Sequence, residues 1–163
     1  PAPRGAAVPA ISQHHPVGGA GQPIRGGIEA AKYNEWGGRN SDGSDGFASH
    51  RPGWEMPVHQ LFVKHGVTAF IQGHDHLFVR QELDGVAYIT CPMSGDPGYN
   101  TYNSEHYLSG DKLSNTGHLK MMVTENDVQM QYIKAVLPGD EAAQGANGKV
   151  AYAWSFSQRR KAE

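Results

Sequence analysis

Hydrophobic and polar positions alternate along several short stretches of this chain, and such alternation is typical of strands that bury one face. The strands predicted in this way cover residues 67–72, 77–83, 86–91, 118–124, 128–136 and 149–156. Asp84-Gly85 separates one pair of strands, and a turn at residues 125–127 separates another. Because Asp-Gly pairs favour tight turns between antiparallel strands, we expect two hairpins.

One segment has helical spacing instead. Residues 57–65 place apolar side chains on one face, and Pro57 suits the first helical turn. A further strand is predicted at residues 6–13, although Pro9 cannot donate to a sheet ladder and favours a later start. With residues 67–72 these elements form a β–α–β unit. The expected fold class is therefore mixed α/β, with the β–α–β unit first and antiparallel hairpins after it.

Composition supports a loop-rich domain. The chain has 163 residues, enough for one core, and 31 of them are glycine or proline (21 and 10). Residues 17–57 and 93–115 are rich in turn-forming residues, and we expect loops there, the first of them ordered and packed over another part of the molecule. A net charge of −2 without a long basic run argues against nucleic-acid binding. Without an apolar run of about 18 residues, no membrane span is expected.

Candidate chemistry is concentrated at the end of the strand at residues 67–72. Gly73, His74, Asp75 and His76 follow it directly. Two imidazoles spaced i, i+2 can reach one point in space, and neutral imidazole is a good ligand for transition metals. Asp75, between them, is expected to point away from that point. The alternative is two surface histidines in a loop.

A second histidine ends another apolar stretch. His14 follows Ile11, Ser12 and Gln13, and Pro16 then stops the strand. A strand-end histidine, a loop and helix, and a strand ending in Gly-His-x-His together resemble the calcineurin-like metallophosphoesterases, especially the purple-acid-phosphatase-like branch. In that family a Val-x-x-His motif precedes the Gly-His-x-His motif, and Ile11 to His14 stands in its place here. The resemblance covers most of residues 7–136.

The resemblance implies the C-terminal half of a metallophosphoesterase β-sandwich flanked by helices. The family carries an Asp-x-His type motif, a Gly-Asp motif and a Gly-Asn-His motif before the Val-x-x-His motif, and none of the three occurs before Ile11 in this sequence. We therefore expect residues 1–163 to be a single domain that is the C-terminal part of a larger phosphoesterase catalytic domain. The missing N-terminal half of the same protein is then its expected partner.

By the same resemblance, His14 and His74 bind one metal ion and His76 binds the other, so the three imidazoles are expected to converge. Carboxylates and an asparagine from the missing half complete both sites. The implied cofactors are two divalent or trivalent transition-metal ions, Fe, Zn or Mn, since nitrogen and oxygen ligands do not select among them. The implied reaction is hydrolysis of a phosphate ester, by a phosphatase or a phosphodiesterase.

Two further residues are candidates for substrate contact. Arg25 is the best phosphate-binding candidate because a guanidinium binds phosphate bidentately, and a structural salt bridge is the equal alternative. His15 follows His14 directly and is a candidate for substrate contact or acid–base chemistry, with loop packing as the alternative. The general acid of the family belongs to the missing Gly-Asn-His motif, so the catalytic residue is not assigned in this sequence.

The expected function is thus a metal-dependent phosphoesterase in the intact protein, to which this chain supplies part of a dinuclear metal site. Two-metal hydrolysis needs a bridging carboxylate that sets the spacing of the ions, and the chain alone is expected to be inactive. The alternative is a non-catalytic metal-binding or interaction domain. Relatives of this branch are often exported, so the resemblance favours a secreted or periplasmic location.

Overall fold

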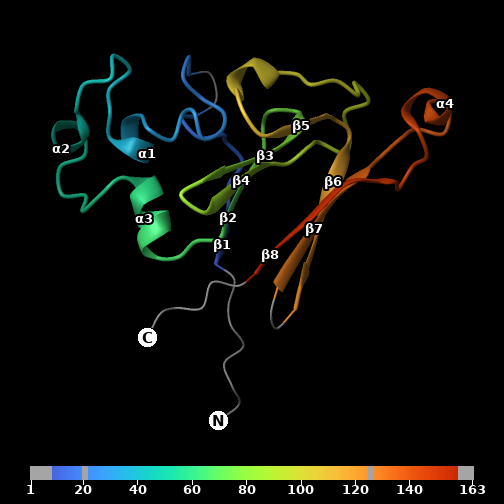
Figure 1. Ribbon diagram of the computed structural model, residues 1–163. Helices are drawn as coiled ribbons and strands as arrows, with labels where there is room; N and C mark the ends of the chain where they lie inside the picture. The colour runs from blue at the N-terminus through green and yellow to red at the C-terminus, as the bar shows by residue number, and fades with distance from the viewer. Residues whose placement is uncertain (1–8, 20–21, 125–126, 158–163) are drawn as a thin grey trace, which may run out of the picture.

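Two β-sheets and a few short helices make up the computed structural model, which describes residues 9–19, 22–124 and 127–157 (Figure 1). One sheet has the strand order β1-β2-β4-β3-β5 and the other has the order β6-β7-β8. The strands are β1 (Ala10–Ser12), β2 (Ala69–Gln72), β3 (Leu77–Leu83), β4 (Val86–Thr90), β5 (Asp111–Ser114), β6 (Gly117–Val123), β7 (Asp127–Lys134) and β8 (Val150–Ser157). The helices are α1 (Asn34–Gly37), α2 (Phe47–His50), α3 (Val58–Lys64), α4 (Glu141–Gln144) and the 3-10 helix η1 (Ser104–His106).

The predicted β–α–β unit is confirmed. Strand β1 pairs in parallel with β2, and α3 lies between them in the chain. Pro57 is the N-cap of α3, and Gly66, just after the helix, has φ +66°, as expected for a helix-ending glycine. Strand β1 begins after Pro9, whose carbonyl accepts a hydrogen bond from Thr68 N–H at 2.9 Å. The proline therefore shifts the start of the strand without breaking the unit.

Both predicted hairpins are present. Strands β3 and β4 pair antiparallel around Asp84 (φ +48°) and Gly85 (φ +72°), which is the backbone of a tight hairpin turn. Strands β6 and β7 also pair antiparallel, and β8 completes their sheet. Of the turn predicted at residues 125–127, residues 125 and 126 lie outside the described part of the chain. The mixed fold class expected from the pattern is confirmed.

Alternation along the strands divides the core into two layers (Figure 1). Phe70 and Tyr88 point to the helices and pack with Trp36. Phe78 points to the second sheet, where its ring stacks on Tyr132 with 4.9 Å between centroids. The five-stranded sheet thus lies between a helical layer and the three-stranded sheet.

The prediction of a loop throughout residues 93–115 is wrong in part. This segment contains η1 and β5, and β5 pairs antiparallel with β3. Leu113 is the only apolar residue of β5, so backbone hydrogen bonding to β3, which hydrophobic patterning cannot detect, defines the strand. Residues 17–57 contain α1 and α2 and bury Val17, Ala30 and Trp36, as expected of an ordered, packed loop. Within the described ranges, no helix is long and apolar enough to cross a membrane.

Candidate metal site

Two histidines from separate motifs meet where the parallel strands β1 and β2 end. Nε2 of His14 lies 3.4 Å from Nδ1 of His74, and both side chains are exposed. The backbone holds them together, because Gly73 N–H donates to His14 O at 3.0 Å and Gln13 N–H donates to Ile71 O at 3.0 Å. Carboxyl ends of adjacent parallel strands meet at one edge of a sheet, which explains why motifs 60 residues apart converge.

His74 has a left-handed backbone, with φ +71°. This conformation is uncommon for residues other than glycine and costs energy, and such residues cluster at functional sites. Gly73, just before His74, is not among the residues with positive φ. A Cβ at Gly73 would lie 3.4 Å from His14 O, an ordinary van der Waals contact, so neither the backbone conformation nor the space requires a glycine there.

His15 completes a cluster of three rings. Its centroid lies 5.2 Å from that of His14 and 5.7 Å from that of His74. His15 is exposed and also lines a groove with apolar residues of the helical layer. It is therefore placed beside the His14–His74 pair, in reach of a molecule that binds there.

His76 faces a carboxylate. Its Nδ1 lies 2.7 Å from Oδ2 of Asp96, so Nε2 is the nitrogen left to bind a metal. The backbone N–H of Gly98 and then the His76 side chain hold the pKa of Asp96 below its ordinary value. A carboxylate on the far nitrogen of a histidine fixes its tautomer and orientation, which is how metal-binding histidines are usually held.

The donor geometry fits a transition-metal ion at the first pair. Two nitrogens that each lie roughly 2.0–2.1 Å from one tetrahedral ion are about 3.3 Å apart, close to the 3.4 Å found. Among the residues that the structure describes, no group of three or more His, Cys, Asp or Glu side chains could hold a metal ion by itself. The three predicted ligands are thus arranged as a pair, His14 with His74, and a separate His76.

Asp75 points away from the histidines, as its position between them suggests. Its side chain is fully buried. Oδ1 forms an ion pair with Arg25 Nη2 and accepts a hydrogen bond from Asn103 Nδ2, both at 3.0 Å. Tyr107 donates to Oδ2 at 2.8 Å. Burial, and then the charge of Asp75, raises the pKa of Tyr107, so its hydroxyl stays protonated and donates. Arg25 therefore occupies the salt bridge that was one of its two predicted roles.

Two buried glutamines attach the loops of the site to the sheet. Gln72, the last residue of β2, accepts from Val17 N–H and donates to Gly26 O, both at 2.8 Å. Gln81 of β3 accepts from Ile28 N–H at 3.1 Å. Gln81 also approaches Gly27 so closely that a Cβ there would lie 1.5 Å from its Oε1. These contacts fix Val17 and residues 26–28 over the sheet.

A carboxylate links this loop to the segment at η1. Glu29 Oε1 accepts from the backbone N–H groups of Leu108 at 2.9 Å and of Ser109 at 3.1 Å, and from Gln81 Nε2 at 2.9 Å. Sequence reasoning missed Gln72, Gln81 and Glu29. A polar residue on a strand that is otherwise apolar was the one available signal, and it applies to both glutamines.

Between the two loops lies an open pocket of about 510 Å³ beside His74. Its lining consists of Gln22, Pro23, Arg25, His74, Tyr102, Asn103 and His106. Arg25 and Asn103, two of the partners of Asp75, therefore reach the surface here. The pocket joins the candidate phosphate-binding residue to one of the candidate metal ligands.

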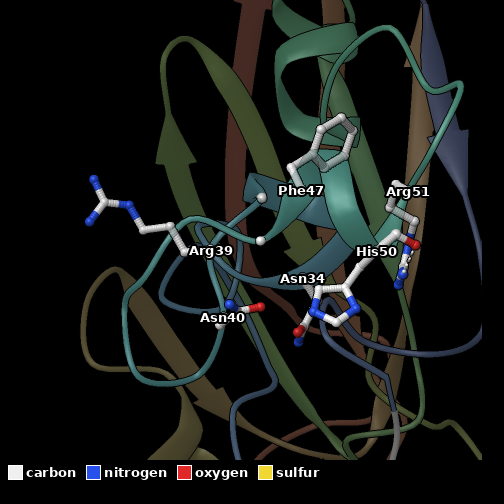
Figure 2. Close-up of a pocket in the computed structure, with 8 residues that line it drawn as sticks. Asn34, Arg39, Asn40, Phe47, His50 and Arg51 are labelled. Atoms are coloured by element: carbon white, nitrogen blue, oxygen red, sulfur yellow. Dashed lines mark hydrogen bonds between the residues drawn. The ribbon is translucent and has the colours of Figure 1, made fainter.

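A smaller polar pocket, of about 140 Å³, lies elsewhere, in the segment of α1 and α2 (Figure 2). Its lining includes Asn34, Asn40 and His50, whereas the guanidinium of Arg39 points away from the other labelled residues. Arg51 forms an ion pair with Glu35, with 2.9 Å between Nη2 and Oε2. With one arginine turned out and the other paired, the cationic groups do not converge here.

Comparisons with known proteins show a similarity of fold. No family model matches the chain, and no curated protein matches it. GAP50, the anchor in the inner membrane complex of Plasmodium, has a similar structure with a TM-score of 0.50 at 18% identity, over 74% of this chain. Vacuolar Protein Sorting 29 from Cryptosporidium parvum aligns with a TM-score of 0.37 at 16% identity, over 64% of this chain. The matches span 33% and 46% of those two chains.

Proposed function

We propose that this chain supplies part of a dinuclear metal site in a larger phosphoric ester hydrolase, a phosphatase or phosphodiesterase. The observation that carries the proposal is the 3.4 Å separation of His14 Nε2 and His74 Nδ1, which suits two ligands of one ion. His76, held by Asp96, is the ligand of the second ion. When bound, the ions supply Lewis-acid activation of water and of the ester.

The residues of this chain have separate roles in the proposed site. His14 and His74 hold one ion, and Asp96 orients His76 toward the other through the 2.7 Å contact at Nδ1. Arg25, fixed by buried Asp75, presents its guanidinium edge to an anionic substrate beside His74. His15 lies close enough to the pair to contact the same substrate.

The proposal needs further ligands from outside the described residues, because these form no complete metal site. An open sheet edge supports the idea that an upstream half of the same protein brings them. Strand β1 is the edge of the five-stranded sheet, and Ile11 on it is 39% exposed. Beside β1 a groove of about 560 Å³ is lined by apolar side chains that include Trp36 and Phe62. A strand and a helix could add there.

The activity test compares the 163-residue chain with a longer protein that carries the upstream half. On a chromogenic aryl phosphate and phosphodiester, with added Mn or Zn, the longer protein is expected to turn over and the short chain to show little or no turnover. His74→Ala or His76→Ala in the longer protein should lower kcat/KM by more than the roughly 10–100-fold that loss of a ligand-orienting group costs. His118→Ala, on exposed β6, is the matched control.

The same assay separates the proposal from the alternative of a non-catalytic metal-binding domain. If the longer protein binds metal through His14 and His74 but hydrolyses neither ester, the alternative holds. Normal turnover by the short chain would contradict the need for outside ligands. The carboxylates Asp42, Asp45 and Asp96 would then be tested as the bridging group.

A further inference from the structure

The pocket beside His74 has the composition of an anion site. Its side chains offer a guanidinium, two imidazoles and two amides, from Arg25, His74, His106, Gln22 and Asn103. Among its lining residues, all of them described, there is no carboxylate. Nitrogen donors from both walls of one cavity suit a tetrahedral oxyanion, which accepts several hydrogen bonds at once.

The floor of the pocket is built from a buried ion pair. Arg25 is 9% exposed and Asp75 is fully buried, with 3.0 Å between Nη2 and Oδ1. A buried pair contributes little net stability because desolvation offsets the Coulomb attraction, so its presence favours a positioning role. Asp75 is paired with Nη2 of Arg25, and the guanidinium has further N–H groups that can donate to a ligand. The ion pair therefore holds Arg25 in place as a donor in the pocket.

The opposite wall is held equally firmly. Gly26 (φ +117°) packs against η1 so closely that a Cβ there would lie 2.9 Å from His106 O. Glu29 fixes the chain just after η1 through its contacts with Leu108 and Ser109. Glu105, whose Oε1 lies 3.8 Å from His106 Nε2, is 71% exposed. The two walls thus keep their spacing without a ligand, which lowers the ordering cost of binding.

We propose that this pocket binds a second phosphoryl group of the substrate, one that is not hydrolysed. His14 and His74 define the reacting end, and the pocket extends from His74 toward His106 and Gln22. A volume of about 510 Å³ accommodates more than a single phosphate and falls in the range of small-molecule sites. The substrate class is therefore an ester that carries two phosphates. This assignment rests on the proposed function for the reacting end only.

The test is a titration of the 163-residue chain with inorganic phosphate in the presence of EDTA, followed by 1H–15N NMR. We expect saturable shifts at the amides of Gln22, Asn103 and His106, with affinity on the order of millimolar. His106→Ala and Gln22→Ala should each weaken binding about tenfold, as loss of a hydrogen bond to a charged group does. His118→Ala is the control and should leave the affinity unchanged.

Three results would overturn the assignment: no saturable binding, shifts confined to other parts of the chain, or acetate binding as tightly as phosphate, which would make this a carboxylate site. Circular dichroism of each variant confirms that a loss of binding is not a loss of fold. Because the titration excludes metal, its failure leaves the hydrolase proposal standing. Conversely, phosphate binding that depends on His106 would survive a failure of the hydrolase assay.

Discussion

The sandwich core and the loops of the site are stabilised in different ways. Between the sheets, Phe78 and Tyr132 stack at 4.9 Å, so burial of apolar surface dominates there. Over the carboxyl ends of β1 and β2, Gln72 and Gln81 hold Val17, Gly26 and Ile28 through hydrogen bonds to the backbone. Apolar packing tolerates substitutions of similar volume, whereas a buried polar network fails when one member is lost. The two regions should therefore respond differently to mutation.

The largest expected effect is in the core. Phe78→Ala should lower the free energy of unfolding by about 3–5 kcal/mol, because a fully buried ring and its stack on Tyr132 are lost. Urea denaturation measures it, and Phe78→Leu should cost clearly less since more volume is kept. Equal losses for the two variants would mean that packing does not dominate there.

Alkaline pH should affect both regions. Burial raises the pKa of Tyr88, Tyr107 and Tyr132 above the ordinary 10. The protonated form is thus favoured in the folded state, so the stabilisation is complete below pH 10 and is lost as pH rises toward the folded pKa values. Each of these tyrosines should lower the free energy of unfolding by about 1.4 kcal/mol for each pH unit above 10.

Tyrosinate absorbance measured with circular dichroism tests this dependence. Absorbance from the three buried tyrosines should appear together with loss of structure. In Tyr107→Phe, the free energy of unfolding should fall less steeply with pH above 10, because the contribution of one tyrosine is removed. Ionisation of Tyr132 in the intact fold would contradict the account.

A smaller and local effect is expected at the loop anchor. Gln72→Ala leaves Val17 N–H and Gly26 O without their buried partner, at a cost of about 1–3 kcal/mol. In Gln72→Ala, amide hydrogen exchange should become faster at Val17, and the change at Phe78 should be much smaller. Gln72→Glu is the matched variant, because it keeps the acceptor for Val17 and loses the donor for Gly26. Uniform acceleration over both sheets would show that the loop and the core unfold together.

The smallest expected effect concerns the orientation of His76. Asp96→Asn keeps the size of the side chain but removes the charged acceptor at His76 Nδ1, 2.7 Å away. In the longer protein, affinity for the second metal ion should fall about 10-fold, at the low end for loss of such a partner. Isothermal titration with Zn measures it. Unchanged affinity would make the His76–Asp96 contact structural.

The same contrast explains what the sequence could predict. The β–α–β unit and both hairpins follow from periodicity and turn residues, because apolar burial produces those patterns. His14 and His74 were found because each ends a strand next to a recognisable motif. The role of Gln72 and the path of β5 could not be predicted, since each depends on hydrogen-bond partners distant in sequence. For Arg25, only the folded chain shows that Asp75 is the partner.

The most direct test of the central claim is anomalous diffraction at the zinc edge from crystals, grown with Zn, of the longer protein that carries the upstream half. The account predicts a peak roughly 2.0–2.2 Å from both His14 Nε2 and His74 Nδ1, because their present 3.4 Å separation already suits two ligands of one ion. No peak between the two imidazoles in crystals that hold Zn elsewhere would contradict it.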